Sequence, residues 1–175
     1  MNICLGIDPG LARLGWGVVA QEGYKLRALC YGCIETSPNI LFSHRLLEIY
    51  NSLNDIYLNL EQEPDFMSIE RLFFGKNVKT AEFVWQARGV VMLWAAQKNL
   101  NIIEPEPNQI KLALCGTGGA DKQQVQRMVQ RFLNLDEVPK PDDTADALAA
   151  AVAGLAYDES PRLSANMGIR FRAGS

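Results

Sequence analysis

The chain contains no long uncharged apolar run, and this absence excludes a membrane-spanning protein. A membrane-spanning helix needs about 20 consecutive apolar residues, and no segment of the 175 residues approaches that length. The first residues, Met1 to Gly6, also lack the basic region that precedes the apolar part of a secretory signal. We therefore expect a cytoplasmic protein that does not associate with membranes.

Cysteine is also scarce. The four Cys are scattered over positions 4, 30, 33 and 115, which is typical of a reducing compartment and not of a disulfide framework. Cys30 and Cys33 form a C-x-x-C pair, but a tetrahedral zinc site needs a second pair, and residues three apart on a strand point to opposite faces. Small buried side chains are the favoured interpretation, and zinc or redox chemistry is the alternative.

Nucleic-acid-binding proteins usually carry an excess of basic charge. This chain has no such overall excess. Its formal net charge is −3. Between residues 71 and 131, however, nine Lys or Arg stand against four Asp or Glu, so this segment carries +5 and the remainder carries −8. Such a segment either forms a phosphate-binding face on an acidic molecule or consists of ordinary solvated helix surfaces.

The length and the 48% hydrophobic content predict one compact domain over residues 1–157. The tail at 158–175 has no periodicity, and we expect it to be poorly ordered. Apolar patterns and turn residues predict strands at 3–7, 16–20, 26–34, 66–69 and 101–104, and helices at 40–60, 78–98, 109–114, 122–135 and 144–157. This order predicts an α/β fold with a mixed five-stranded sheet flanked by helices.

The helix predicted at 78–98 is apolar around much of its circumference. A helix of this kind buries more than one face. It is either a central core helix or a core helix that also forms a subunit interface.

Four carboxylates occupy positions where strands or helices end. Asp8 and Glu70 follow apolar strands, at the edge where ligand sites of α/β sheets form. Asp143 and Asp146 are three residues apart at the start of an alanine-rich helix, so they share a face near its positive end. Taken singly, each has a simpler explanation, because Asp is common in turns and in the first turn of a helix. Asp142 is the expected cap of that helix.

Together, the four carboxylates indicate a metal site. Like charges held close together raise one another's pKa and oppose folding, whereas divalent cations would balance them. We therefore expect two Mg²⁺ ions in the site, for which Mn²⁺ would substitute.

Two other segments suggest contacts with phosphates or bases. Gly116 to Gly119 precede a helix that begins near Lys122, where backbone N–H groups favour an anion. The segment is not a P-loop, because Gln123 occupies the Ser/Thr position, and a plain hinge is the alternative. Asp121 and Gln124 predict a capping box there. Phe73 and Phe74 lie close in sequence to Lys76 and Lys79. The two phenylalanines either stack on bases or pack in the core.

Five motifs over residues 2–157 resemble, in order and spacing, the RuvC family of Holliday-junction resolvases. They are Gly6-Ile7-Asp8-Pro9-Gly10, Ile69-Glu70-Arg71-Leu72-Phe73-Phe74-Gly75-Lys76-Asn77, Gln86-Ala87-Arg88-Gly89, Gly119-Ala120-Asp121-Lys122 and Asp143-Thr144-Ala145-Asp146-Ala147-Leu148-Ala149. The resemblance implies a ribonuclease H-like fold, a homodimer and Mg²⁺-dependent symmetrical nicking of four-way DNA junctions. It also implies 5′-phosphate and 3′-hydroxyl ends, and the RuvA and RuvB branch-migration complex as a partner.

The resemblance further assigns roles by position. Asp8, Glu70, Asp143 and Asp146 match the catalytic, metal-binding quartet. Phe73 matches an aromatic residue at the junction crossover, and the expected basic DNA contacts are Arg71, Lys76, Lys79, Arg88, Lys111 and Lys122.

Two other functions stay open at this point. A junction-binding protein without cleavage would share the motifs. The segment from Gly6 to Gly10 also resembles the first phosphate loop of actin-like ATPases, although those folds need two such domains.

Overall fold

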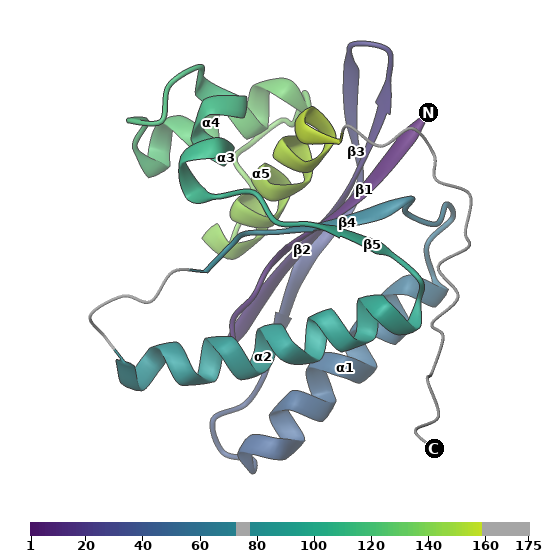
Figure 1. Cartoon of the computed structure of the whole chain (residues 1–175), viewed down its shortest axis with the longest axis vertical. Helices are drawn as coiled ribbons and strands as arrows, with labels where there is room; N and C mark the ends of the chain where they lie inside the picture. The colour runs from purple at the N-terminus through teal and green to yellow at the C-terminus, as the bar shows by residue number, and fades with distance from the viewer. Residues whose placement is uncertain (73–77, 159–175) are drawn as a thin grey trace, which may run out of the picture.

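A mixed sheet forms the centre of the computed structural model, which describes residues 1–72 and 78–158, the side chains of 78–81 excepted. The strand order is β3-β2-β1-β4-β5 (Figure 1). The strands are β1 (Asn2–Asp8), β2 (Arg13–Glu22), β3 (Lys25–Glu35), β4 (Phe66–Ile69) and β5 (Asn101–Ile103). The first three pair antiparallel, while β1–β4 and β4–β5 are parallel. The predicted mixed five-stranded sheet is confirmed.

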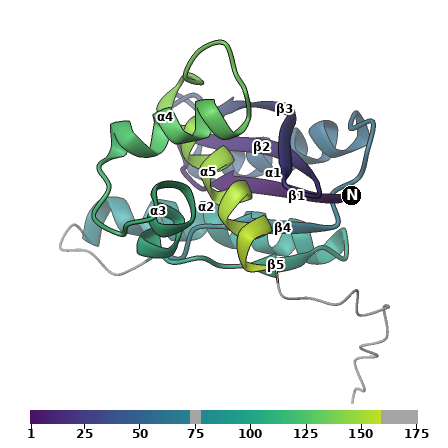
Figure 2. The ribbon, with the colours of Figure 1, turned by 90° about the horizontal axis from the view of Figure 1, so that it is seen from above.

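Helices cover both faces of this sheet. They are α1 (Phe42–Leu58), α2 (Val78–Gln97), α3 (Pro107–Cys115), α4 (Lys122–Phe132) and α5 (Asp142–Tyr157). Figure 1 shows α1 and α2 on one side of the sheet and α3, α4 and α5 on the other. Seen from above in Figure 2, α5 lies across the central strands, and its main contacts are with β1 and β2.

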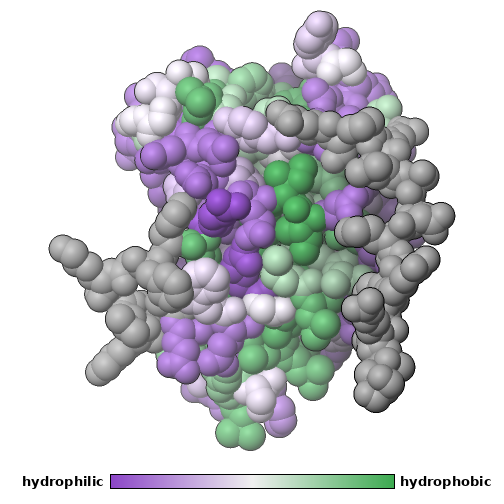
Figure 3. Space-filling view, in the orientation of Figure 1, coloured by the Kyte–Doolittle hydropathy of each residue, from purple (hydrophilic) through white to green (hydrophobic). Residues whose placement is uncertain are grey.

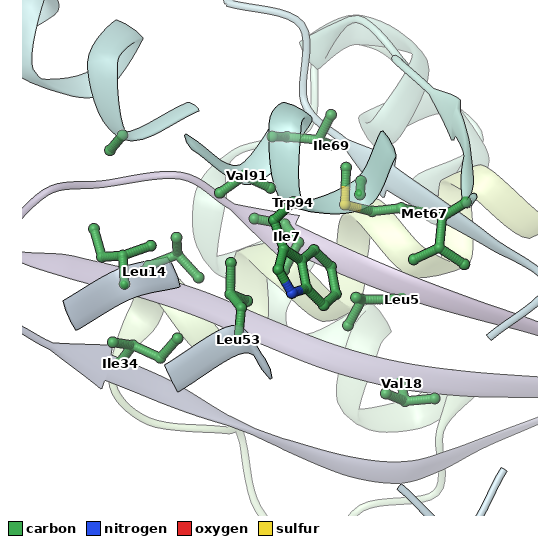
Figure 4. Packing of buried hydrophobic residues seen from close by; sticks show 14 of the residues in the cluster. Leu5, Ile7, Leu14, Val18, Ile34, Leu53, Met67, Ile69, Val91 and Trp94 are labelled. Atoms are coloured by element: carbon green, nitrogen blue, oxygen red, sulfur yellow. The ribbon is translucent and has the colours of Figure 1, made fainter. Parts of the chain in front are cut away.

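The alternation of side chains along β1 divides the core into two clusters. Ile3, Leu5 and Ile7 face α1 and α2, whereas Cys4 faces α5, as the period of two in a strand requires. On the α1 and α2 side, Trp94 lies at the centre of the cluster (Figure 4). Its indole N–H donates to Asn54 Oδ1 at 3.2 Å, so its polar atom is satisfied within the core.

Glycines let α5 approach the sheet closely. A Cβ on Gly6 would lie 2.0 Å from the Ala147 carbonyl oxygen, and one on Gly15 would lie 1.9 Å from the Asp143 carbonyl oxygen. No side chain fits in those positions. The helix is buried along most of its length, and its first turn therefore lies against the ends of β1 and β2.

Three helix starts differ by two residues from the sequence prediction, the first being α1, which begins at Phe42 and not at residue 40. α3 begins at Pro107, because Glu106 and Gln109 form a capping box that the apolar pattern alone did not reveal. α5 begins at Asp142 and its N-cap residue is Pro141, so the prediction of Asp142 as the cap was wrong. The predicted capping box of Asp121 and Gln124 at α4 is confirmed.

The four cysteines are free. Cys4 is buried, while Cys30, Cys33 and Cys115 are partly exposed, so only the first matches the expected buried position. Among the described residues, no helix is long and apolar enough to span a membrane.

Candidate active site at the ends of the parallel strands

Asp8 and Glu70 are positioned by the pairing of β1 with β4. Ile7 lies opposite Ile69 in this parallel pair, and both are buried against α1 and α2. Since neighbouring residues on a strand point to opposite faces, the next residues, Asp8 and Glu70, are directed to the face that carries α5.

Asp143 and Asp146 reach the same place from α5. Asp8 pairs with Gly15 across β1 and β2, and the backbone of Asp143 rests on Gly15. One turn further along α5, Asp146 lines a pocket together with Glu70. The structure therefore brings the four predicted carboxylates to one edge of the sheet.

The carboxylates influence one another electrostatically. Burial, followed by the charges of Asp146, Glu70 and Asp143, raises the pKa of Asp8 from 3.8 to about 7. Burial and the charge of Asp146 raise the pKa of Glu70. Burial also raises the pKa of Asp146, although Lys122 opposes this increase. Buried like charges of this kind are typical of functional sites.

Basic side chains partly balance this charge. Lys122 Nζ lies 3.0 Å from Asp146 Oδ2 and 3.2 Å from Asp142 Oδ2. Arg13 Nη1 lies 3.6 Å from Asp143 Oδ2. Each pair is partly exposed, so each contributes little to stability by itself. Together, the two basic side chains reduce the repulsion among Asp142, Asp143 and Asp146.

A pocket of about 220 Å³ opens beside these groups. It is lined by Glu70, Pro107, Ile110, Lys111, Lys122, Val125, Asp146 and Ala149. Carboxylates form one part of its wall, two lysines another, and apolar residues of α3, α4 and α5 its base. A phosphate group could be held here by the lysines with its reacting bond toward the carboxylates.

The donor set suits a hard divalent cation. Carboxylate oxygens are the ligands that Mg²⁺ prefers, and a cation would relieve the repulsion that raises the pKa of Asp8. Within residues 1–72 and 78–158, no three His, Cys, Asp or Glu side chains already converge on one point as metal ligands would. The carboxylates would therefore move closer together around an ion.

The residues expected to contact DNA fall into three groups. Lys111 and Lys122 line the pocket. Arg71 is exposed, and its Nη1 lies 3.5 Å from Glu106 Oε1. Arg88 is 7% exposed, forms an ion pair with Glu104 and lies over the Trp85 ring, a setting that favours a structural role. Phe73, Lys76 and the side chain of Lys79 lie outside the described residues.

Two residues of the site were not anticipated from the sequence as contributors to it. Arg13 follows Asp8 by five positions, and the antiparallel pairing of β1 with β2 returns it toward Asp143. Asp142 shares the Lys122 ammonium with Asp146. Arg13 could have been found from the sequence by pairing β1 with β2 in register. Asp142 could have been found by placing Lys122 near the start of α5.

An α/β fold with acidic residues gathered at the ends of parallel strands defines a class of enzyme sites that hold metal ions and act on phosphate esters. A family model described as "Crossover junction endodeoxyribonuclease RuvC" matches residues 4–154. The crossover junction endodeoxyribonuclease RuvC of Alkaliphilus oremlandii is 51% identical over 150 residues, covering 86% of this chain and 90% of the relative. That of Ruminiclostridium cellulolyticum is 47% identical over 166 residues, covering 95% and 97%.

Solved structures agree with the sequence relatives. Thermus thermophilus RuvC in complex with a Holliday junction substrate matches with a TM-score of 0.79 and 33% identity, over 89% of this chain and 94% of that one. The chain belongs to the RuvC family of crossover junction endodeoxyribonucleases, and its fold is the predicted ribonuclease H-like fold. The ATPase alternative therefore has no support.

Proposed function

We propose that this chain resolves Holliday junctions by Mg²⁺-dependent nicking of two opposed DNA strands, leaving 5′-phosphate and 3′-hydroxyl ends. The observation that carries the proposal is the placement of Asp8, Glu70 and Asp146, with raised pKa values, at one edge of the sheet beside a pocket that also contains Lys111 and Lys122. The relatives named as crossover junction endodeoxyribonucleases support the choice of substrate.

In this proposal, Asp8, Glu70, Asp143 and Asp146 hold two divalent ions. When bound, the ions lower the pKa of an attacking water and stabilise the leaving 3′ oxygen of an in-line displacement. The pairing of β1 with β2 places Asp8 at the end of β1, beside the start of α5. No protein nucleophile is required.

The lysines have a separate role in this proposal. Lys111 and Lys122 orient the scissile phosphate and stabilise the charge that develops on its oxygens. With Asp146 as an ion ligand, Asp142 would still hold the Lys122 ammonium at the pocket. The chain's own residues thus provide both the acidic ion site and the basic phosphate site.

A cleavage assay separates this enzyme from a protein that only binds junctions. The full chain is incubated with a mobile four-way junction and Mg²⁺ or Mn²⁺, and the strands are separated on a denaturing gel. We expect paired nicks at symmetrical positions, and their loss in Asp146→Asn while junction binding persists. The exposed variant Asp136→Asn is the matched control. Binding without nicks in the wild-type chain with either ion would show that the chain only binds junctions.

We also propose a homodimer, because two symmetrical nicks call for two sites related by a twofold axis. On α2, Phe83 and Leu93 are 45% and 59% exposed, although the Phe83 ring also packs against Phe42 of α1. Hydrophobic side chains are visible on the face of the molecule that carries α2 (Figure 3). Leu93→Asp should therefore shift sedimentation toward the monomer. Leu58→Asp, at the end of α1 where Leu58 is 76% exposed, should not.

The cellular location, the partner complex and the domain limits of the chain are also proposals. A junction substrate would place the chain with chromosomal DNA in the cytoplasm, where we propose that it works with the RuvA and RuvB branch-migration complex. Residues 1–157 would form the nuclease domain and residues 158–175 a tail. Cleavage of a junction in the presence and absence of the RuvA and RuvB complex tests the partner.

A further inference from the structure

A second pocket lies on the outer side of α4, away from the carboxylates. It has a volume of about 300 Å³ and is lined by Cys115, Thr117, Gln124, Arg127, Met128 and Arg131. We call this pocket the outer groove. It shares no lining residue with the pocket that contains Glu70 and Asp146, so the proposed catalytic site does not account for it.

The position of the groove follows from the two faces of α4. Val125 and Val129 are buried and fix one face of the helix against the core. Arg127 and Arg131 lie one turn apart on the other face, and both are exposed. Residues four apart on a helix are neighbours, so the two guanidinium groups belong to one surface.

These two arginines carry charge that nothing in the described structure neutralises. Around the catalytic pocket, Lys122 is paired with Asp142 and Asp146, Arg13 with Asp143, and Arg71 with Glu106. By contrast, Arg127 and Arg131 form no ion pair with any residue in the ranges 1–72 and 78–158. Asp121, at the start of the same helix, is engaged as a cap, its Oδ1 accepting the Gln124 N–H at 2.8 Å.

The chemistry of the groove matches a phosphate backbone. Guanidinium groups bind phosphate oxygens in a bidentate manner. Gln124 and Thr117 add an amide and a hydroxyl, which also contact DNA backbones. In a chain whose net charge is −3, a local patch of unpaired positive charge is the feature that would attract DNA.

The spacing also fits a duplex that extends from the catalytic site. At 1.5 Å per residue, Arg131 lies about 14 Å along α4 from Lys122, which corresponds to about four base-pair steps of 3.4 Å. A strand held at Lys122 could therefore have neighbouring phosphates at the outer groove.

We infer that Arg127 and Arg131 form a second phosphate-binding site, which holds the backbone of a junction arm beyond the point of cleavage. This inference rests on the proposed function. The site contributes affinity and not chemistry, because its arginines reach neither the carboxylates nor the pocket lysines. It also explains how an acidic protein binds DNA: Lys122 and Arg13 at the reaction centre are engaged in internal ion pairs, while the two arginines of the groove add positive charge that no ion pair within residues 1–72 and 78–158 neutralises.

The salt dependence of junction binding tests the inference. Binding of a fluorescent four-way junction is measured in EDTA over about 50 to 200 mM salt, where each phosphate contact contributes about 0.9 to the slope of log K against log salt. Arg127→Gln and Arg131→Gln should each reduce the slope by about 0.9, and the double variant by about 1.8. Lys98→Gln, at the end of α2 beside Tyr57, is the matched control and should leave the slope unchanged.

Each result of this experiment has a distinct meaning. Because both arginines are exposed, the variants should unfold at the wild-type temperature, and at saturating enzyme they should nick the junction at the wild-type rate. A double variant with the wild-type slope would overturn the inference while leaving the proposed function intact. Equal loss of slope in Lys98→Gln would overturn it as well, because the effect would then be one of total charge. A wild-type chain that binds no junction would overturn the proposed function itself.

Discussion

The ammonium of Lys122 lies 3.0 Å from Oδ2 of Asp146. The lysine begins α4 and the aspartate lies in α5, so this contact joins two helices at the mouth of the catalytic pocket. It places a positive charge where the proposed function requires a metal ion. The proposed function would therefore give Lys122 two partners, Asp146 in the metal-free protein and the scissile phosphate in the loaded site.

Replacing this lysine should change the pH dependence of cleavage. The charge of Lys122 lowers the pKa of Asp8 and of Asp146, so Lys122→Gln should raise both. The acidic limb of the pH–rate profile should move to higher pH, and the rate at the plateau should fall about 10² to 10³-fold because one charged donor is lost. Lys122→Arg should retain the wild-type limb. An unchanged limb in the glutamine variant would show that Lys122 does not influence the ionisation of the carboxylates.

Asp8 should make the metal-free protein less stable as pH rises. Its pKa is about 7 in the folded chain against 3.8 ordinarily, so the folded state binds more protons than the unfolded state between these values, and the free energy of unfolding falls across this range. Removing the charge of Asp8 should prevent this fall in the free energy of unfolding. Asp8→Asn should be more stable than wild type at pH 8, by at most about 4 kcal/mol, and equal to it at pH 4.

Urea unfolding in EDTA at pH 4, 6 and 8 measures the effect of Asp8. Asp136→Asn, an exposed aspartate, is the control and should follow the wild-type curve. Adding Mg²⁺ should remove most of the difference between wild type and Asp8→Asn, because the ion then balances the carboxylates. Stability that is independent of pH in wild type would mean that Asp8 ionises normally.

The close approach of α5 depends on Gly15. A Cβ at this position would lie 1.9 Å from the Asp143 carbonyl oxygen, so Gly15→Ala must push the start of α5 away from β2. We expect a loss of about 1 to 3 kcal/mol in the free energy of unfolding, as for other overpacked sites, and loss of cleavage in whatever fraction stays folded.

Gly89→Ala provides the matched control for Gly15→Ala. A Cβ on Gly89 meets no atom within 4 Å, and replacing glycine by alanine inside a helix stabilises it by about 1 kcal/mol. Thermal unfolding of the two variants should therefore move in opposite directions. Equal effects would show that the contact between Gly15 and Asp143 does not limit the position of α5.

Much of this site could be predicted because it depends on local pattern. The apolar runs ending at Asp8 and Glu70, and the three-residue spacing of Asp143 and Asp146, fix faces and edges without reference to the rest of the chain. The position of Arg88 could not be predicted in this way. Its partner, Glu104, follows β5, and only the packing of α2 against that strand brings the two together. A basic residue in a motif looks the same in sequence whether it faces a ligand or an internal carboxylate.

The ion pair of Arg88 with Glu104 gives the final prediction. Arg88→Met alone should destabilise the chain by about 1 to 3 kcal/mol, because it removes a charge-assisted hydrogen bond from Glu104, whose side chain is 34% exposed. The double variant Arg88→Met with Glu104→Met should recover most of this stability, since apolar side chains often replace a buried pair without loss. If the role of Arg88 is structural, the double variant should also bind a junction with the wild-type affinity and salt dependence. A double variant that folds with wild-type stability but has a reduced salt slope would instead place Arg88 in contact with DNA.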